Sequence, residues 1–133
     1  MTNTHAPVIG IDFDGTIMAN GDACFPEATN EPIPGAIRII NGWYDDGFYI
    51  VIHSCRYGVS EQHMIDWLDA NGVRRHAVNE NLPHRIEAFG GDTRKISCDV
   101  NLDDKNIDLG GRPVTRYTWA AWDSMIRTRF QKR

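Results

Sequence analysis

The hydrophobic pattern of the chain alternates between short apolar runs and longer amphipathic segments. The runs at 8–13 and 48–52 are almost continuously apolar and rich in β-branched residues, which is typical of strands buried on both faces. Two weaker strands are expected at 73–78 and 98–102. Between and after the strands, apolar residues at three-to-four spacing predict amphipathic helices. These helices are expected over 34–45, 60–71, 82–89 and 119–130.

Strands that alternate with helices favour a parallel sheet, because parallel strands must be joined by long crossover connections. Continuously apolar strands further indicate that both faces of the sheet are covered. We therefore expect an α/β fold, a three-layer Rossmann-like (HAD-like) parallel sheet with helices on both faces. No repeat or linker divides the sequence, so residues 1–133 are expected to form a single domain. Residues 17–32 are loop-like and can form at most a flap, which is too little for a folded cap domain.

The composition narrows the classes of function. The 133 residues include 14 basic and 18 acidic side chains, for a net charge of -4. This acidic balance argues against a broad nucleic-acid surface, which needs clustered Lys and Arg. The last seven residues form a basic tail with four cationic side chains. Such a tail is typical of a solvated helix end, and it could also contact an anion. The four cationic residues are Arg127, Arg129, Lys132 and Arg133.

The sequence shows no recognisable membrane span or secretory signal, and its few cysteines suit a reducing compartment. The longest apolar stretch, 48–52, is far shorter than the roughly 20 residues that span a bilayer, so no membrane partner is expected. The first residues do not have the basic and apolar regions of a secretory signal. Cys24, Cys55 and Cys98 are too few and too scattered for a disulfide framework. A reduced, cytoplasmic protein is therefore the default expectation.

Polar side chains gather where the expected strands end. In open parallel sheets the carboxyl ends of the strands meet at one edge, and ligands bind there. The first strand leads into acidic, glycine and threonine residues, the second into serine, cysteine and arginine, and the last into an acidic pair preceded by a lysine. These residues are Asp12, Asp14, Gly15 and Thr16, then Ser54, Cys55 and Arg56, and finally Lys95, Asp103 and Asp104.

The acidic residues at this edge suggest a metal site. Asp12 and Asp14 are two residues apart, so in an extended segment their side chains leave on the same side. With Asp103 and Asp104 added, like charges would raise one another's pKa or push the chain apart. A hard divalent cation removes this conflict, and an all-oxygen ligand set suits Mg²⁺. The residues therefore suggest a magnesium-dependent site that handles a phosphate.

Four segments resemble, in order, the motifs of the haloacid dehalogenase (HAD) superfamily. IDFDGT at 11–16 resembles the first motif, and IVIHS at 50–54 resembles the second. Lys95 is similar to the third-motif lysine, and VNLDD at 100–104 is similar to the acidic fourth motif. Residues 95–111 also resemble a pattern of small cap-less HAD-like hydrolases of bacteria and phages. In that pattern a lysine precedes Asp-Asp-(Lys/Arg)-Asn and then Gly-Gly.

The resemblance implies hydrolysis of a phosphomonoester through an aspartyl-phosphate, with Mg²⁺ as the cofactor. Asp12 would be the nucleophile. Asp14 would protonate the leaving oxygen and then activate water, and its backbone carbonyl would ligate the metal. Together with Asp12 and Asp14, one or both of Asp103 and Asp104 would hold the ion, and the resemblance does not decide between the two.

The resemblance also implies how the phosphate is bound. Ser54 would donate a hydrogen bond to a phosphate oxygen, and Lys95 would neutralise phosphate charge and position Asp12. Arg56 is expected either to grip a second phosphate or a carboxylate of the substrate, or to pair with an acid. Cys55 is expected to be a small buried residue rather than a nucleophile, because no His-and-acid arrangement supports it. The remaining substrate-binding positions are expected at Gly15, Thr16 and, beside Ser54, Cys55.

A small phosphorylated metabolite is the expected substrate, but other readings stay open. Taken singly, Asp14-Gly15 is typical of a turn and Ser54 of a helix cap, so a non-catalytic phosphate-binding or scaffold domain is an alternative. A receiver-like signalling domain fits poorly, because its acceptor aspartate would stand where Ser54 stands. A phosphatase that acts on the ends of nucleic acids is a further alternative, because the basic tail could contact a nucleic acid. Exposed tryptophans on the terminal helix would make self-association reasonable.

Overall fold

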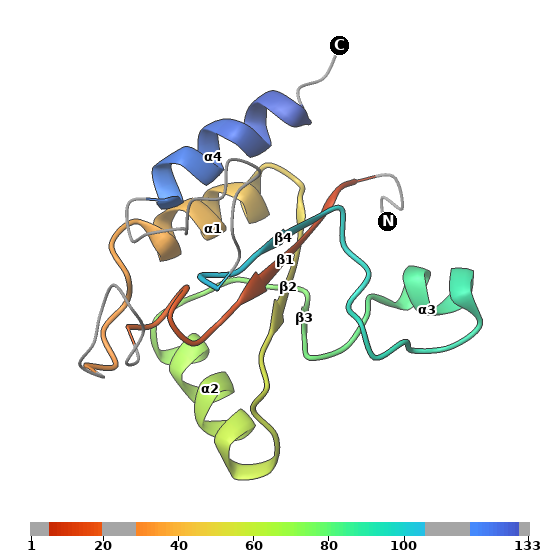
Figure 1. Cartoon of the computed structure of the whole chain (residues 1–133), viewed down its shortest axis with the longest axis horizontal. Coiled ribbons are helices and arrows are strands. Elements are labelled where there is room, and N and C mark those ends of the chain that lie inside the picture. Colours follow the sequence, from red (N-terminus) through yellow and green to blue (C-terminus); the bar gives the residue numbers. More distant parts are fainter. Residues whose placement is uncertain (1–5, 20–28, 106–117, 131–133) are drawn as a thin grey trace.

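The computed structural model describes residues 6–19, 29–105 and 118–130. Its centre is a four-stranded parallel sheet with the strand order β3-β2-β1-β4 (Figure 1). The central strands are β1 (Val8–Asp12) and β2 (Tyr49–His53), and the edge strands are β3 (Ala77–Val78) and β4 (Val100–Leu102). The structure thus confirms the expected α/β, Rossmann-like parallel sheet.

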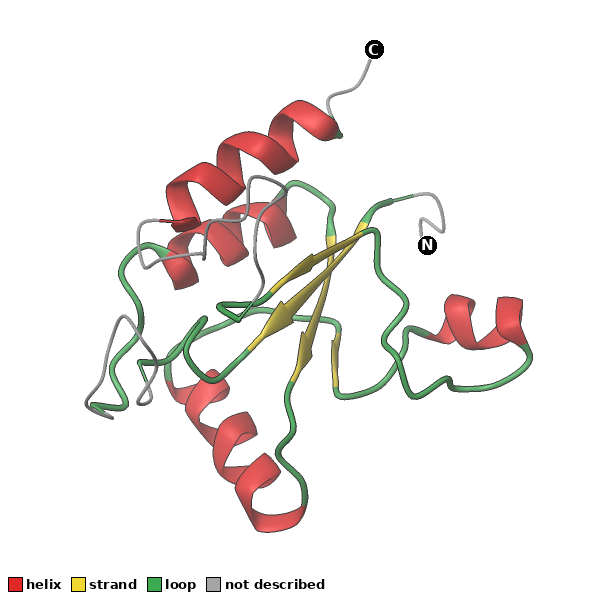
Figure 2. Ribbon diagram, viewed as in Figure 1, coloured by secondary structure: helices red, strands yellow, loops and turns green. Residues whose placement is uncertain are grey.

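In the described part of the chain, four helices accompany the sheet (Figure 2). They are α1 (Ala36–Asp45), α2 (Gly58–Ala70), α3 (Pro83–Phe89) and α4 (Thr118–Arg129). The expected helix at 34–45 begins two residues later, because Gly35 at φ 87° is outside the helical region. The helix expected from Ser60 begins earlier, at Gly58. The strand expected at 73–78 is confined to its last two residues.

The two faces of the sheet are covered unequally. One face presents Ile9, Ile11, Ile50 and Ile52 to the main hydrophobic core, which also contains side chains of α1, α2 and α4. The other face presents Val8 and Val51 to a smaller cluster formed with Ala77 and Leu82. Helix α3 has no buried residue, so this second layer is thin. Asp12 and His53 alternate with Ile11 and Ile52 and therefore belong to the thinly covered face.

The register of the strands brings distant acidic residues level with one another. Asp12 pairs with His53 across β1 and β2, and Ile11 pairs with Leu102 across β1 and β4. Asp103, which follows Leu102, is consequently level with Asp12 at the carboxyl edge of the sheet. The site is therefore built by strand pairing between segments about 90 positions apart in sequence.

Tryptophans fix the terminal helix to the core instead of being exposed. Trp119 is only 3% exposed and lies 5.8 Å from Trp43 between ring centroids. Trp122 is partly buried and packs against the same core. The expectation of exposed tryptophans on this helix is therefore wrong, since α4 needs them to pack against α1. Within the described residues, no helix combines the length and apolarity required to cross a bilayer.

Candidate active site

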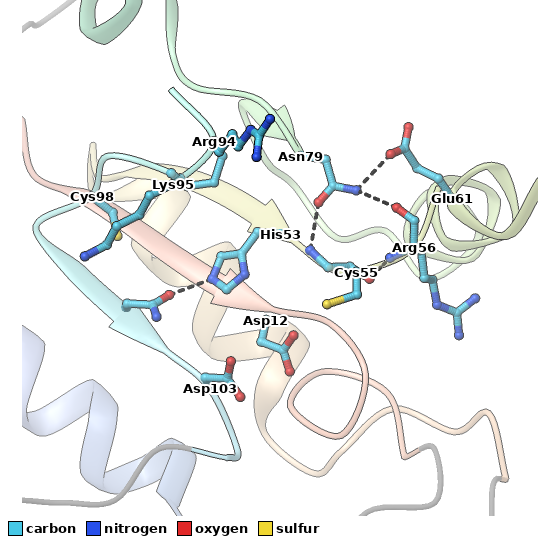
Figure 3. A pocket seen from close by; sticks show the side chains of 13 residues that line it. Asp12, His53, Cys55, Arg56, Glu61, Asn79, Arg94, Lys95, Cys98 and Asp103 are labelled. Carbon is cyan, nitrogen blue, oxygen red and sulfur yellow. Dashed lines mark hydrogen bonds between the residues drawn. The ribbon is translucent and has the colours of Figure 1, made fainter. Parts of the chain in front are cut away.

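Three carboxylates converge at the carboxyl ends of β1 and β4. Asp12, Asp103 and Asp104 each offer an oxygen, and these oxygens all lie within 4.8 Å of one another. Figure 3 shows the side chains of Asp12 and Asp103 facing the same space. Each of the three residues is partly buried. The structure thus brings together three of the four aspartates that were expected to form a metal site, and we call this group the acid cluster.

Thr16 connects two members of the acid cluster. Its Oγ1 lies 3.1 Å from Oδ2 of Asp12 and 3.2 Å from Oδ1 of Asp104, and it accepts the backbone N–H of Asp104 at 2.9 Å. One hydroxyl proton can be donated to only one carboxylate at a time. The indole N–H of Trp119 donates to the backbone oxygen of Thr16 at 2.8 Å, so α4 holds this turn. The hydroxyl therefore leaves part of the repulsion between the two acids uncompensated.

The electrostatics of the acid cluster are those of crowded, partly desolvated anions. The pKa of Asp12 is raised from 3.8 to about 8, chiefly by burial and also by the charge of Asp103 and the hydrogen bond with Asp104. The hydrogen bond from Thr16 acts in the opposite direction. The pKa of Asp104 is also raised, chiefly by burial. The protein alone therefore favours a proton on this cluster at neutral pH, and a bound cation would remove that need.

Asp14 has different surroundings although it is only two residues from Asp12. Arg56 binds it in a bidentate pair, with Nε 2.9 Å from Oδ2 and Nη2 2.7 Å from Oδ1. Hydrogen bonding to Asp14 raises the pKa of Arg56 further. Of the two roles that the sequence left open for Arg56, the structure shows the pairing with an acid. The carboxylate of Asp14 lies outside the acid cluster, while metal binding through its backbone carbonyl stays a prediction.

A cleft of about 500 Å³ opens beside the acid cluster on the thinly covered face of the sheet (Figure 3). Ser54, Cys55, Arg56 and Lys95 line it, as expected, together with residues that the sequence did not single out. The lining residues are Asp12, His53, Ser54, Cys55, Arg56, Glu61, Asn79, Arg94, Lys95, Ile96, Cys98, Asn101 and Asp103.

Other expected positions differ from their predicted surroundings. Cys55 is exposed, so the expectation that it is buried is wrong, because it follows the end of β2 on an open loop. Gly15 and Thr16 do not belong to the residues that line this cleft. The N–H of Gly15 donates to Met18 and that of Thr16 to Phe13, so both close the turn after β1.

Lys95 borders the cleft without pairing with Asp12. Its side chain forms no ion pair with Asp12 in the described part of the chain. In Figure 3 the imidazole of His53 lies between the Lys95 ammonium and the Asp12 carboxylate. Nε2 of His53 is 2.6 Å from Oδ1 of Asn101, and this contact links the ends of β2 and β4. The positioning of Asp12 by Lys95 therefore stays a prediction.

Asn79 is a site residue that the sequence analysis missed. It occupies the left-handed region at φ 54° directly after β3. Its Oδ1 accepts the N–H of Ser54 at 2.7 Å, and its Nδ2 donates to the carbonyl of Arg56 and to Glu61. One amide thereby fixes the loop that carries Ser54 and Arg56. Its position at a strand exit, together with the tolerance of asparagine for positive φ, was the available signal.

The donor set of the acid cluster fits magnesium. All its side-chain ligands are carboxylate oxygens, which are preferred by hard divalent cations, and Mg²⁺ characteristically takes one or two carboxylates and keeps several waters. Soft ligands such as thiolates are not part of the cluster. The Gly-Gly segment at 110–111 and residues 20–28 of the expected flap lie outside the described residues.

The chain is similar to a protein of known structure. A conserved protein from Bacteroides thetaiotaomicron shares 30% sequence identity and superposes with a TM-score of 0.70. The similarity covers 94% of this chain and 93% of the other. No protein-family model matches the chain, and no curated protein matches it. Identity at this level over nearly the whole of both chains shows that the chain belongs to the same family as the Bacteroides protein.

Proposed function

We propose that this member of the family is a magnesium-dependent phosphomonoester hydrolase that acts through an aspartyl-phosphate on Asp12. The observation that carries the proposal is the acid cluster at the edge of a cleft that also contains Ser54 and Lys95. Carboxylates for a metal and a nucleophile, beside a hydroxyl and a cation for phosphate, are the groups that phosphoryl transfer requires. Their order in the chain is also the order of the HAD motifs that the sequence resembles.

Asp12 suits the role of nucleophile by position. It ends a central strand, lines the cleft and belongs to the acid cluster, so one carboxylate faces both the expected ion and the expected phosphate. A nucleophilic carboxylate must be ionised, whereas burial and neighbouring acids raise the pKa of Asp12 to about 8. Bound Mg²⁺ would supply the positive charge that favours ionised aspartates and offsets charge on the phosphoryl group. Asp103 and Asp104 would then be ligands rather than repulsive neighbours.

Asp14 suits proton transfer, under the control of Arg56. The bidentate ion pair favours the charged carboxylate, which is the form needed to activate water for breaking the aspartyl-phosphate. To protonate the leaving oxygen first, Asp14 must turn away from the guanidinium and take up a proton. Release of Arg56, for example when substrate enters, is therefore part of the proposed cycle.

Ser54 and Lys95 suit phosphate binding. Oγ of Ser54 accepts the N–H of Arg56 at 3.0 Å, an interaction that uses a lone pair and leaves the hydroxyl proton for donation. Asn79 holds the backbone of Ser54, so the hydroxyl is positioned before substrate arrives. The Lys95 ammonium adds positive charge to a cleft that is also lined by three acids. We propose that these two groups bind the non-bridging oxygens of the phosphate.

Hydrolysis of an aryl phosphate tests this function. We expect the wild type to turn over 4-nitrophenyl phosphate with Mg²⁺ and not with EDTA. Asp12→Asn keeps the shape of the side chain and removes the attacking charge, so turnover should fall by at least about 10⁴-fold. Asp66→Asn, which changes an exposed acid on α2, is the matched control and should keep full activity. Magnesium-independent turnover, or turnover retained by Asp12→Asn, would contradict the proposal.

A further inference from the structure

Two adjacent cations border the cleft on the loop between α3 and β4. Arg94 and Lys95 both line the cleft, and both residues are exposed. Within the described residues, neither side chain forms a hydrogen bond or an ion pair with another residue. Figure 3 shows both side chains on the opposite side of His53 from Asp12 and Asp103. We call the part of the cleft that is lined by Arg94 and Lys95 its cationic end.

The loop that carries these cations is fixed by a buried asparagine. Asn81 is only 3% exposed and its Nδ2 donates to Asp92 at 2.7 Å and to the backbone oxygen of Thr93 at 3.1 Å. Its Oδ1 accepts the N–H of Ser97 at 2.6 Å, and Thr93 Oγ1 donates to the carbonyl of Lys95 at 2.7 Å. These bonds close the loop on both sides of Arg94. The backbone of the cationic end is thus ordered before any ligand binds, which lowers the entropy cost of binding.

The positive charge in the cleft exceeds what one phosphate needs. Of the three cations that line the cleft, Arg56 is occupied by Asp14, which leaves Arg94 and Lys95. Lys95 is assigned to the reacting phosphate in the proposed function. Arg94 then has no side-chain partner among the residues that the structure describes, although its planar guanidinium is suited to bidentate binding of a carboxylate or phosphate. A volume of about 500 Å³ is also in the range of sites that hold a whole small molecule.

We propose that Arg94 binds a second anionic group of the substrate, so that the enzyme prefers phosphomonoesters that carry a carboxylate or another phosphate away from the scissile bond. The inference rests on the proposed function for the orientation of the substrate, with its reacting phosphate toward Asp12. Asn81 acts as a positioning residue, since it orders the loop without lining the cleft. Arg94 thereby determines specificity without taking part in bond cleavage.

The test compares two nearly isosteric substrates. In 4-carboxyphenyl phosphate the second group is anionic, and in 4-carbamoylphenyl phosphate it is neutral. We expect Arg94→Ala to lower kcat/KM for the carboxylate compound by about tenfold more than for the amide, the loss typical of one charge-assisted contact. Using the ratio between variant and wild type cancels the difference in leaving group. 1,4-Phenylene bisphosphate, compared in the same way, shows whether phosphate or carboxylate is the preferred anion.

A matched control and a binding measurement separate this inference from the proposed function. Arg38→Ala removes an exposed arginine of α1 and should leave both substrates unaffected. Calorimetric titration with 4-carboxyphenylphosphonate and 4-carbamoylphenylphosphonate measures the preference without turnover. If no aryl phosphate is hydrolysed but the carboxylate preference is lost in Arg94→Ala, the anion site stands and the proposed function fails. Equal effects of Arg94→Ala on the carboxylate and amide compounds would overturn the anion site.

Discussion

Asp12 and Asp14 are separated by one residue, yet the fold gives them opposite electrostatic surroundings. Asp12 faces Asp103 and Asp104, and its pKa is raised to about 8. Asp14 is paired with Arg56 through two hydrogen bonds. Proximity in sequence therefore brought two carboxylates to one edge of the sheet without giving them one function. Asp12 belongs to a cluster that suits a cation from solution, whereas Asp14 is paired with Arg56 of the same chain.

After the loss expected for Asp12→Asn, the largest effect should come from removing the carboxylate of Asp14, which is paired with Arg56. We expect Asp14→Asn to lower kcat for an aryl phosphate by about 10²–10⁴-fold, the range for loss of a general acid or base. Magnesium affinity should change little, because the Asp14 carboxylate lies outside the acid cluster. Steady-state kinetics at saturating Mg²⁺ measures the effect.

Asp45→Asn is the matched control for that variant. Asp45 is also paired with an arginine, Arg74, but on an exposed surface away from the cleft. Its removal should leave kcat unchanged. Equal kcat values for Asp14→Asn and the wild type would show that the ion pair with Arg56 is purely structural.

A smaller effect is expected in the pH dependence of stability. The folded-state pKa of Asp12 is about 8 and its ordinary value is 3.8, so between these values the folded state binds more protons than the unfolded state. Stability from this group is thus complete below about pH 4 and is lost as the pH rises toward 8. We expect the Tm measured in EDTA to fall less steeply over this range in Asp12→Asn. If Tm fell equally steeply with pH in the two proteins, the raised pKa of Asp12 in the folded state would be refuted.

The smallest effect concerns the turn that connects the two aspartates to the core. Trp119→Phe keeps the aromatic ring packing but removes the N–H that donates to the backbone oxygen of Thr16. Leaving that buried oxygen without its donor should cost about 1–2 kcal/mol, or roughly 4–8 °C in Tm. Trp67→Phe, which removes an exposed bond to the carbonyl of Asn30, should cost less. Equal losses of Tm in the two variants would show that burial of the Thr16 bond is unimportant.

The sequence predicted the parallel sheet and the gathering of Asp12, Asp103 and Asp104 because both follow from local pattern. Continuously apolar runs indicate buried parallel strands, and such strands expose their last residues at one edge. The pairing of Asp14 with Arg56 could only be left open, because it joins residues 42 positions apart whose side chains have several partners within reach. Charge type alone does not choose among them.

The residues that the sequence missed are those whose roles depend on long-range packing. Asn79 and Asn81 look like ordinary loop residues, yet each fixes a cleft-forming segment through its side-chain amide. The pattern predicted the amphipathic helix that carries Trp119 but not the burial of this residue against Trp43, because an amphipathic pattern does not say which element covers the apolar face. Arg94 belongs to none of the recognised motifs, so the sequence did not indicate a binding role. That role was inferred from the cleft that Arg94 lines.

Calorimetric titration of Mg²⁺ into the metal-free protein, with Asp12→Asn in parallel, shows whether the acid cluster is a metal site. We expect one saturable site per chain in the wild type and a marked loss of affinity in the variant, because one carboxylate of the acid cluster is neutralised. Binding to the wild type should also release protons when measured near pH 7, since the pKa of Asp12 before binding is about 8. No Mg²⁺ binding by the wild type, or equal binding without proton release in both proteins, would contradict this expectation.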